Sequence, residues 1–234
     1  MGLVSAVPFE ASLLLGEMKK PRTLGPGVTA GRIGGARVVH MASGVGIANA
    51  ARAATVLCER HRPSALLLFG IGGAYPGSGL STGDLALAER EIYADCGVSL
   101  GDGDYGFEAM GLPLVRAGRR KLFNEFPLDR GLIRRAMRHL GGARPGPFLT
   151  VCLSTGTRAR ALALERRFSA VCENMEGAAV AQVCAIYGLP LLELRGISNV
   201  VEDRDPSKWE KKAASENCQR GVAVLLKSGV LEGL

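Results

Sequence analysis

The chain has 234 residues, of which 47% are hydrophobic and 5% aromatic, and this size and apolar content predict a single α/β domain spanning residues 1–234. The net charge of +7 comes from scattered lysines and arginines, which argues against nucleic acid as a partner and suits a small acidic substrate. No apolar run approaches the ~20 residues that cross a bilayer and no signal peptide is evident, so we expect a cytoplasmic protein with no membrane partner.

Apolar runs, helical periodicity and turn residues divide the chain into alternating strands and helices. In chain order, we predict a strand at residues 3–7, a helix at 11–19, a strand at 36–42, a helix at 47–60, strands at 65–69 and 84–91, a long loop at 95–112, a helix at 128–140, a strand at 148–153, a helix at 158–168, a strand at 170–173, a helix at 174–187, a strand at 191–197 and a helix at 207–226. This alternation indicates an α/β fold with a mostly parallel sheet.

The six cysteines are widely spaced, and none forms a C-x-x-C pair. Cys58 and His61 make a C-x-x-H with no second half, so we expect no metal site. Several cysteines lie in apolar runs, such as Cys152 between Val151 and Leu153. We therefore expect buried free thiols, as in proteins of a reducing compartment.

Two glycine-rich segments follow predicted strands. Gly44 and Gly46 precede the helix at 47–60, and residues 70–73 read Gly-Ile-Gly-Gly. Neither segment completes the G-x-G-x-x-G fingerprint, so no dinucleotide or other cofactor is expected. The glycines either make tight turns or direct backbone N–H groups at a ligand, and in the second case Gly72 and Gly73 are candidate substrate-binding residues.

Three polar side chains are candidates for chemistry at the edge of the sheet. Glu10 follows the first predicted strand at its carboxyl end, where open α/β sheets bind ligands. Glu176 starts a predicted helix beside Gly177 and two alanines, and such small neighbours favour a carboxylate that faces a pocket. Glu173 is interpreted instead as an acid that complements the helix dipole. Asn199 follows the last predicted strand and is either a turn residue or a group of the same site.

Five motifs occur in an order and spacing that resemble the nucleoside phosphorylase and nucleosidase superfamily. They are Ala6-Val7-Pro8-Phe9-Glu10, Ser43-Gly44-Val45-Gly46, Gly70-Ile71-Gly72-Gly73, Asn174-Met175-Glu176-Gly177 and Arg195-Gly196-Ile197-Ser198-Asn199. Within that superfamily, residues 174–179, 195–199 and 202–207 resemble the futalosine hydrolases. The resemblance implies a three-layer α/β/α fold with a central twisted mixed sheet. It also implies an N-ribosyl hydrolase that releases hypoxanthine from futalosine in menaquinone biosynthesis.

The resemblance implies a role for each candidate residue. Glu10 activates water, Glu176 holds the ribose hydroxyls, and Met175 packs beneath the sugar. Asn199 stands where adenosine-type nucleosidases have an aspartate that stabilises the departing base, which puts adenine in doubt as the preferred base. Trp209 falls at the place of an aromatic residue in a lid helix over the site.

The pocket for the ribose 5′ substituent is the least defined part of the site. Val45 and the loop around Phe107 and Met110 are candidates for it. In similar proteins a neighbouring subunit supplies part of this pocket, so we expect a homo-oligomer, at least a dimer.

Three other functions stay open. A methylthioadenosine/adenosylhomocysteine or aminodeoxyfutalosine nucleosidase is the first alternative. A purine nucleoside phosphorylase needs arginines at the phosphate, and the loops at residues 6–10 and 69–73 carry none, so hydrolysis is favoured. A non-catalytic nucleoside-binding protein would have no need of Glu10.

Overall fold

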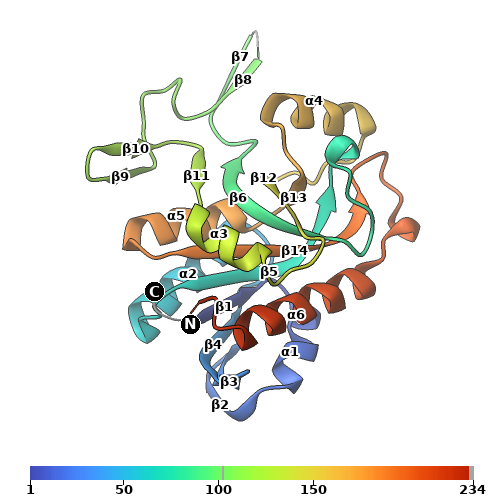
Figure 1. Ribbon diagram of the computed structural model, residues 1–234. Coiled ribbons are helices and arrows are strands. Elements are labelled where there is room, and N and C mark those ends of the chain that lie inside the picture. Colours follow the sequence, from blue (N-terminus) through green and yellow to red (C-terminus); the bar gives the residue numbers. More distant parts are fainter. Residues whose placement is uncertain (102, 232–234) are drawn as a thin grey trace.

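The computed structural model describes residues 1–101 and 103–231 and arranges them around one ten-stranded sheet (Figure 1). Its strands are β1 (Gly2–Ser5), β2 (Lys19–Gly25), β3 (Val28–Ile33), β4 (Ala36–Ala42), β5 (Leu66–Ala74), β6 (Leu85–Tyr93), β11 (Glu125–Pro127), β12 (Arg144–Thr150), β13 (Cys172–Asn174) and β14 (Leu191–Val200). The order from one edge is β11, β6, β12, β13, β5, β1, β4, β3, β2, and β14 pairs with both β5 and β6. The pairings of β6, β12, β13, β5 and β14 therefore close a ring.

The sheet is mixed. β1 runs parallel to β4 and β5, and β12 runs parallel to β6 and β13. In contrast, β2, β3 and β4 form an antiparallel meander, and β13 and β14 are antiparallel to β5 and β6 respectively. The prediction of a mostly parallel sheet is therefore wrong, because residues 19–42 return through short hairpins instead of crossover helices. The mixed sheet implied by the resemblance is confirmed.

Helices cover both faces of the sheet. On one face α2 (Ile47–His61) packs against α5 (Gly177–Tyr187), and on the other α6 (Lys211–Lys227) packs on β14 and β5 and contacts α1 (Ser12–Gly16). The remaining helices are α3 (Arg130–Met137) and α4 (Arg158–Phe168), with 3-10 turns η1 (Pro8–Glu10), η2 (Pro76–Ser78) and η3 (Pro206–Lys208). A Cβ atom on Gly196 would collide with the carbonyl oxygen of Ala214, so glycine allows α6 to approach β14 closely. In the described ranges, no helix combines the length and apolar character required to span a bilayer.

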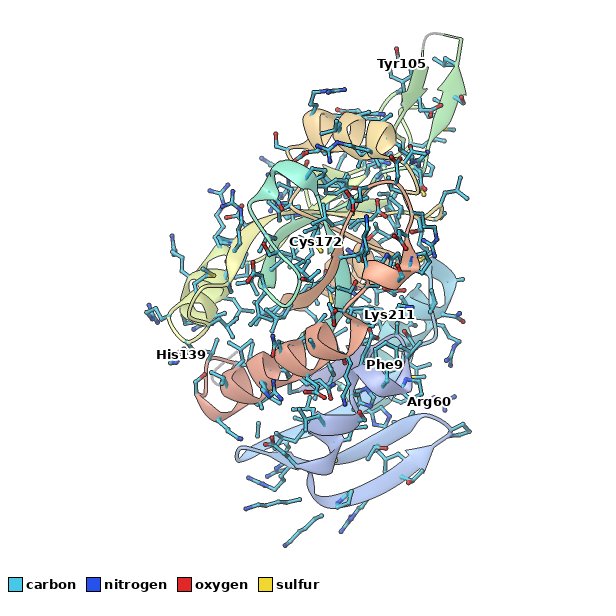
Figure 2. All side chains as sticks on the ribbon, turned by 90° about the vertical axis from the view of Figure 1, so that its right-hand side faces the viewer. Phe9, Arg60, Tyr105, His139, Cys172 and Lys211 are labelled. Atoms are coloured by element: carbon cyan, nitrogen blue, oxygen red, sulfur yellow. The ribbon has the colours of Figure 1, made fainter. Side chains whose placement is uncertain are left out.

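Short exposed strands were missed by the sequence prediction. β2 and β3 form a hairpin where a helix at 11–19 was expected to end, and α1 stops at Gly16. β2 is exposed along nearly its whole length, so it lacks the alternation of apolar residues that marks a strand. The predicted loop at 95–112 contains β7 (Val98–Leu100) and β8 (Gly103–Tyr105), and β9 (Val115–Ala117) pairs with β10 (Arg120–Leu122). Tyr105 marks the β7–β8 hairpin, which projects from the body (Figure 2).

Two buried strands extend beyond their predicted ends. β5 continues through residues 70–73, which were expected to form a loop, and β14 continues through Asn199, which was considered as a turn residue. The register of β14 against β5 shifts between Ile197 and Asn199. A shift of this kind re-aims the following side chains, and here it lies at the point where the strand enters the candidate site.

Candidate active site

Glu10 lies at the carboxyl end of β1, in η1, and its side chain is 3% exposed. Its Oε2 accepts hydrogen bonds from the backbone N–H groups of Ala6 at 2.9 Å and Val7 at 3.1 Å, and its Oε1 accepts one from Ile71 at 2.8 Å. Burial raises the pKa of Glu10 above its ordinary value, against the opposing effect of Arg195 and the N–H donors. The result is a fixed carboxyl group that binds a proton more readily than an exposed glutamate.

Glu176 is the N-cap residue of α5 and is also buried. Its Oε1 accepts a hydrogen bond from the N–H of Gly46 at 3.0 Å, and its Oε2 lies 3.4 Å from Nη1 of Arg195. The sequence predicts that Gly177 leaves open space beside Glu176. In the structure that space is filled. A Cβ atom there would collide with Glu91 Oε1 and lie 2.7 Å from Glu193 Oε2, so Gly177 makes room for two further carboxyl groups.

Asn199 lines a pocket of about 150 Å³ together with Thr155 and Trp209. Its Oδ1 accepts a hydrogen bond from Ser198 Oγ at 2.8 Å, and its Nδ2 donates one to the carbonyl of Val200 at 3.1 Å. Both partners are immediate neighbours of Asn199 in the chain, and both hydrogen bonds are partly buried. Asn199 and Trp209 therefore line the same pocket.

Trp209 does not lie in a helix. It follows η3 and precedes α6, which begins at Lys211 instead of residue 207. The cationic groups of Arg204 and Lys211 lie 4.8 Å and 5.1 Å from the centre of its ring. The lid-helix placement is thus wrong, although the indole still lines the pocket that contains Asn199.

The remaining predicted residues surround these groups. Gly73 pairs with Asn199 in the sheet, and a Cβ atom at Gly73 would lie 3.4 Å from its Nδ2. Gly72 packs against Cys172, where a Cβ atom would lie 2.6 Å from Sγ. Met175 is half-buried directly before Glu176, and Val45 is 51% exposed.

The aromatic residue nearest to Glu10 in sequence is held by the last helix. Phe9 is 45% exposed, and its carbonyl accepts hydrogen bonds from Ser215 and Gln219 of α6. Figure 2 shows Phe9 and Lys211 on the same side of the molecule, at the start of α6. The turn that carries Glu10 is therefore attached to α6 through the carbonyl of Phe9.

Arg195 and Glu173 are site residues that the sequence reasoning did not recognise. Arg195 is 1% exposed and reaches Glu176, although only its place in a motif was noted. Glu173 belongs to β13 and not to the first turn of a helix, so its assignment to the helix dipole is wrong. Its carboxylate accepts hydrogen bonds from the N–H and Oγ1 of Thr155 and from the hydroxyl of Tyr75. Both Arg195 and Glu173 are charged residues inside a largely apolar segment, and this pattern could have indicated them as site residues.

Asp95, Cys96 and Cys152 are the potential metal ligands that lie together in the described part of the chain, within 4.8 Å of one another. The Asp95 oxygens already accept hydrogen bonds from the N–H groups of Cys152 and Leu153, and one lies 3.9 Å from Arg160. A cation would have to displace these contacts. All six cysteines are free, and Cys152 is exposed, contrary to the expectation of burial.

The fold and this edge of the sheet define the class of protein. The family model of the phosphorylase superfamily matches residues 1–228, and the chain belongs to that superfamily. It is 42% identical to the futalosine hydrolase of Thermus thermophilus over 192 residues, which cover 82% of each chain. It is 36% identical to the futalosine hydrolase of Streptomyces coelicolor over 197 residues, which cover 80% of this chain and 79% of that one.

The fold is shared with solved structures. The 5′-methylthioadenosine/S-adenosylhomocysteine nucleosidase of Neisseria meningitidis, in complex with methylthio-immucillin-A, superposes with a TM-score of 0.83 at 23% identity. This match covers 97% of the present chain and 98% of the other. The present chain is thus an enzyme that hydrolyses N-glycosyl bonds. The superfamily and the hydrolase class indicated by the five sequence motifs are both confirmed.

Proposed function

We propose that the substrate is futalosine and that the enzyme releases hypoxanthine from it, a step on the route to menaquinone. The observation that supports the proposal is that all three candidates connect to residues 71–73 of β5. Glu10 accepts a hydrogen bond from the N–H of Ile71, Glu176 contacts Arg195, which donates to the Ile71 carbonyl, and Asn199 pairs with Gly73. The 42% identity to a futalosine hydrolase supports this substrate over others.

The three side chains suit the charges that develop when the bond between ribose and base breaks. Positive charge grows on the sugar, as in glycoside hydrolysis generally, and negative charge grows on the base. In this mechanism the Glu176 carboxylate stabilises the sugar through its hydroxyls, and Asn199 donates a hydrogen bond to the base. Glu10 removes a proton from the attacking water, and its raised pKa suits a general base.

The surroundings of Glu10 favour water over phosphate as the nucleophile. The N–H groups of Ala6 and Val7 in this turn and of Ile71 in β5 are donors of the kind that bind an anion, and all three already bind the Glu10 carboxylate. A phosphate would therefore meet a carboxylate in place of free donors. These occupied donors favour hydrolysis independently of the missing arginines.

The proposal of a 6-oxopurine is tested by Asn199→Asp. An asparagine donates to O6 or N7 of hypoxanthine, whereas an ionised aspartate only accepts and suits a 6-amino group. Because an unpaired buried polar group costs about 1–3 kcal/mol, the ratio of kcat/KM for futalosine over aminodeoxyfutalosine should fall roughly ten- to a hundredfold in the variant. An unchanged ratio would remove Asn199 from base recognition. A wild type that prefers methylthioadenosine would favour the alternative nucleosidase function.

The assembly and compartment complete the proposed function. A homo-oligomer, at least a dimer, is supported by exposed apolar side chains next to Glu10 and Gly46 and in β7 and the segment after β8, namely Phe9, Val45, Leu100 and Met110. Light scattering coupled to size exclusion tests it, and a monomeric mass would contradict it. The free thiols support a reducing, cytoplasmic location.

A further inference from the structure

A buried network of polar groups lies beneath Glu176, and the mechanism above makes no use of most of it. Arg195 is its centre. Its Nε contacts Glu193 Oε1 at 2.9 Å, its Nη1 lies 3.4 Å from Glu176 Oε2, and its Nη2 lies 3.4 Å from Asn174 Oδ1. One guanidinium group therefore binds carboxylates of two different elements, and Glu176, Glu193 and Asn174 are each at most 5% exposed.

The second oxygen of Glu193 shows how this network is completed. Glu193 Oε2 is buried and has no donor if every carboxyl group is ionised. Glu91, from β6, lies beside it, because both side chains fill the space left by Gly177. A carboxyl group can donate a hydrogen bond to a carboxylate only when it is protonated. Burial and the neighbouring Glu193 raise the pKa of Glu91 well above its usual range, so Glu91 carries the proton and binds Glu193.

Glu91 is connected to Glu176 by a second path. Its Oε1 accepts a hydrogen bond from Asn174 Nδ2 at 2.6 Å, and its Oε2 accepts one from Thr150 Oγ1 at 2.7 Å. The other end of the Asn174 amide accepts hydrogen bonds from the backbone N–H groups of Glu176 at 2.9 Å and Gly177 at 2.7 Å. Asn174 thereby fixes the backbone at the start of α5.

We propose that Glu91 is a positioning residue for the ribose-binding carboxylate. As a neutral acid, Glu91 binds both Glu193 and Asn174. Glu193 orients Arg195 on the Glu176 side chain, and Asn174 holds the Glu176 backbone. The inference rests on the proposed function in one respect, namely that Glu176 binds the ribose hydroxyls.

The neutral state of Glu91 has an electrostatic consequence. With Glu91 protonated, Glu176 and Glu193 face Arg195, so this network has one negative charge in excess. That excess favours a cationic sugar. If Glu91 were ionised, a third carboxylate would compete for the same guanidinium and weaken its hold on Glu176.

The test compares Glu91→Leu and Glu91→Gln on futalosine and on its 2′-deoxy analogue. Glu91→Leu removes both paths, and a misplaced reacting group can cost about a hundredfold in rate, so kcat/KM for futalosine should fall ~100-fold. Because the lost contact is with ribose hydroxyls, the loss on the 2′-deoxy analogue should be about tenfold or less. The preference for ribose over deoxyribose should therefore shrink.

Glu91→Gln is the conservative variant, and its preference for ribose over deoxyribose should lie between that of the wild type and that of Glu91→Leu. Its amide nitrogen donates to Glu193 only when it replaces the oxygen that accepts from Asn174, so it satisfies one path and not both. We expect the ribose preference to fall by a few-fold, in a protein whose thermal midpoint stays close to the wild type. If Glu91→Leu does not fold, this variant carries the test.

Equal losses on both substrates in the folded variants would overturn the inference, because they would show a general structural role. Glu176→Gln separates this failure from failure of the proposed function. If Glu176→Gln itself leaves the ribose preference unchanged, Glu176 does not bind the hydroxyls, and the proposed mechanism fails first. If it lowers the preference while both Glu91 variants do not, only the inference about Glu91 is wrong.

Discussion

At the scale of single residues, Glu10 is the group whose environment makes the clearest prediction. Glu10→Gln should lower kcat by ~10²–10⁴, the usual contribution of a positioned general base. The wild-type rate should also fall as pH drops through the raised pKa of Glu10, because only the ionised form accepts a proton. This acidic limb should be absent from the variant, and the measurement is kcat against pH for both proteins.

The matched control for this change is Glu17→Gln, because Glu17 is an exposed glutamate that pairs with Lys227 on the protein surface. It should retain the wild-type rate and acidic limb. Hypoxanthine binding by the Glu10 variant checks that the site is still formed, since an amide nitrogen would face one of the three N–H donors. Near-normal turnover by a folded Glu10→Gln protein would show that another group activates the water.

At the scale of elements, the sequence predicted best those segments whose ends are marked by neighbouring residues along the chain. The strand at 36–42 and the helix at 158–168 match β4 and α4 at both ends, because apolar periodicity and turn residues mark them. β2 could not be predicted in this way, since its residues are exposed and its pairing with β3 alone makes it a strand. The glycines at residues 70–73 predict a loop because glycine usually weakens a strand, yet β5 continues through them.

The candidate site also contains residues that local sequence indicates and residues that only the fold brings together. Glu10 and Glu176 could be predicted because each ends or starts an element that the sequence marks. The contacts of Arg195 with Glu176, Asn174 and Ile71 could not, because these residues are distant from Arg195 in sequence and adjacent only in the fold. Nothing in the residues around Glu91 or Thr150 indicates that these side chains meet.

The loop that contains Thr155 gives a prediction at this scale. Glu173 of β13 accepts three hydrogen bonds from Thr155 and Tyr75, and Thr155 lines the pocket with Asn199. Glu173→Gln places an amide donor against these donors, at a cost of about 1–3 kcal/mol in unfolding free energy. Hypoxanthine should bind roughly tenfold more weakly, as measured by calorimetry, because the loop is no longer fixed.

Glu165→Gln is the control for the loop prediction. Glu165 also accepts a hydrogen bond from a loop N–H, that of Gly77 at 2.7 Å, but it lies at the surface beside η2. Its substitution should leave hypoxanthine binding unchanged. Unaltered binding by Glu173→Gln would mean that the pocket loop keeps its position without this carboxylate.

At the scale of the whole molecule, folding removes several ionisable groups from water, with opposite effects on stability. Burial raises the pKa of Glu10 and Glu91, so these carboxyl groups bind protons more readily in the folded chain and favour the fold as pH falls. His40 does the reverse. It is 3% exposed, its Nε2 lies 3.0 Å from Ser5 Oγ, and burial lowers its pKa to about 4.

His40 should therefore contribute to acid sensitivity of the entire fold. An unfolded histidine has a pKa of about 6.5 and takes up a proton below that pH, whereas His40 in the folded chain stays neutral until about pH 4. Its contribution is thus present above pH 6.5 and lost progressively as pH falls toward 4. At pH 5 the loss of unfolding free energy should be about 2 kcal/mol.

Urea unfolding at pH 7.5 and pH 5.0 measures this loss, and His40→Gln should lose about 2 kcal/mol less than the wild type over the same interval. His139→Gln, which alters an exposed histidine just after the end of α3 (Figure 2), should keep the wild-type difference. An identical difference in the His40 variant would show that other groups set the acid limit of the fold.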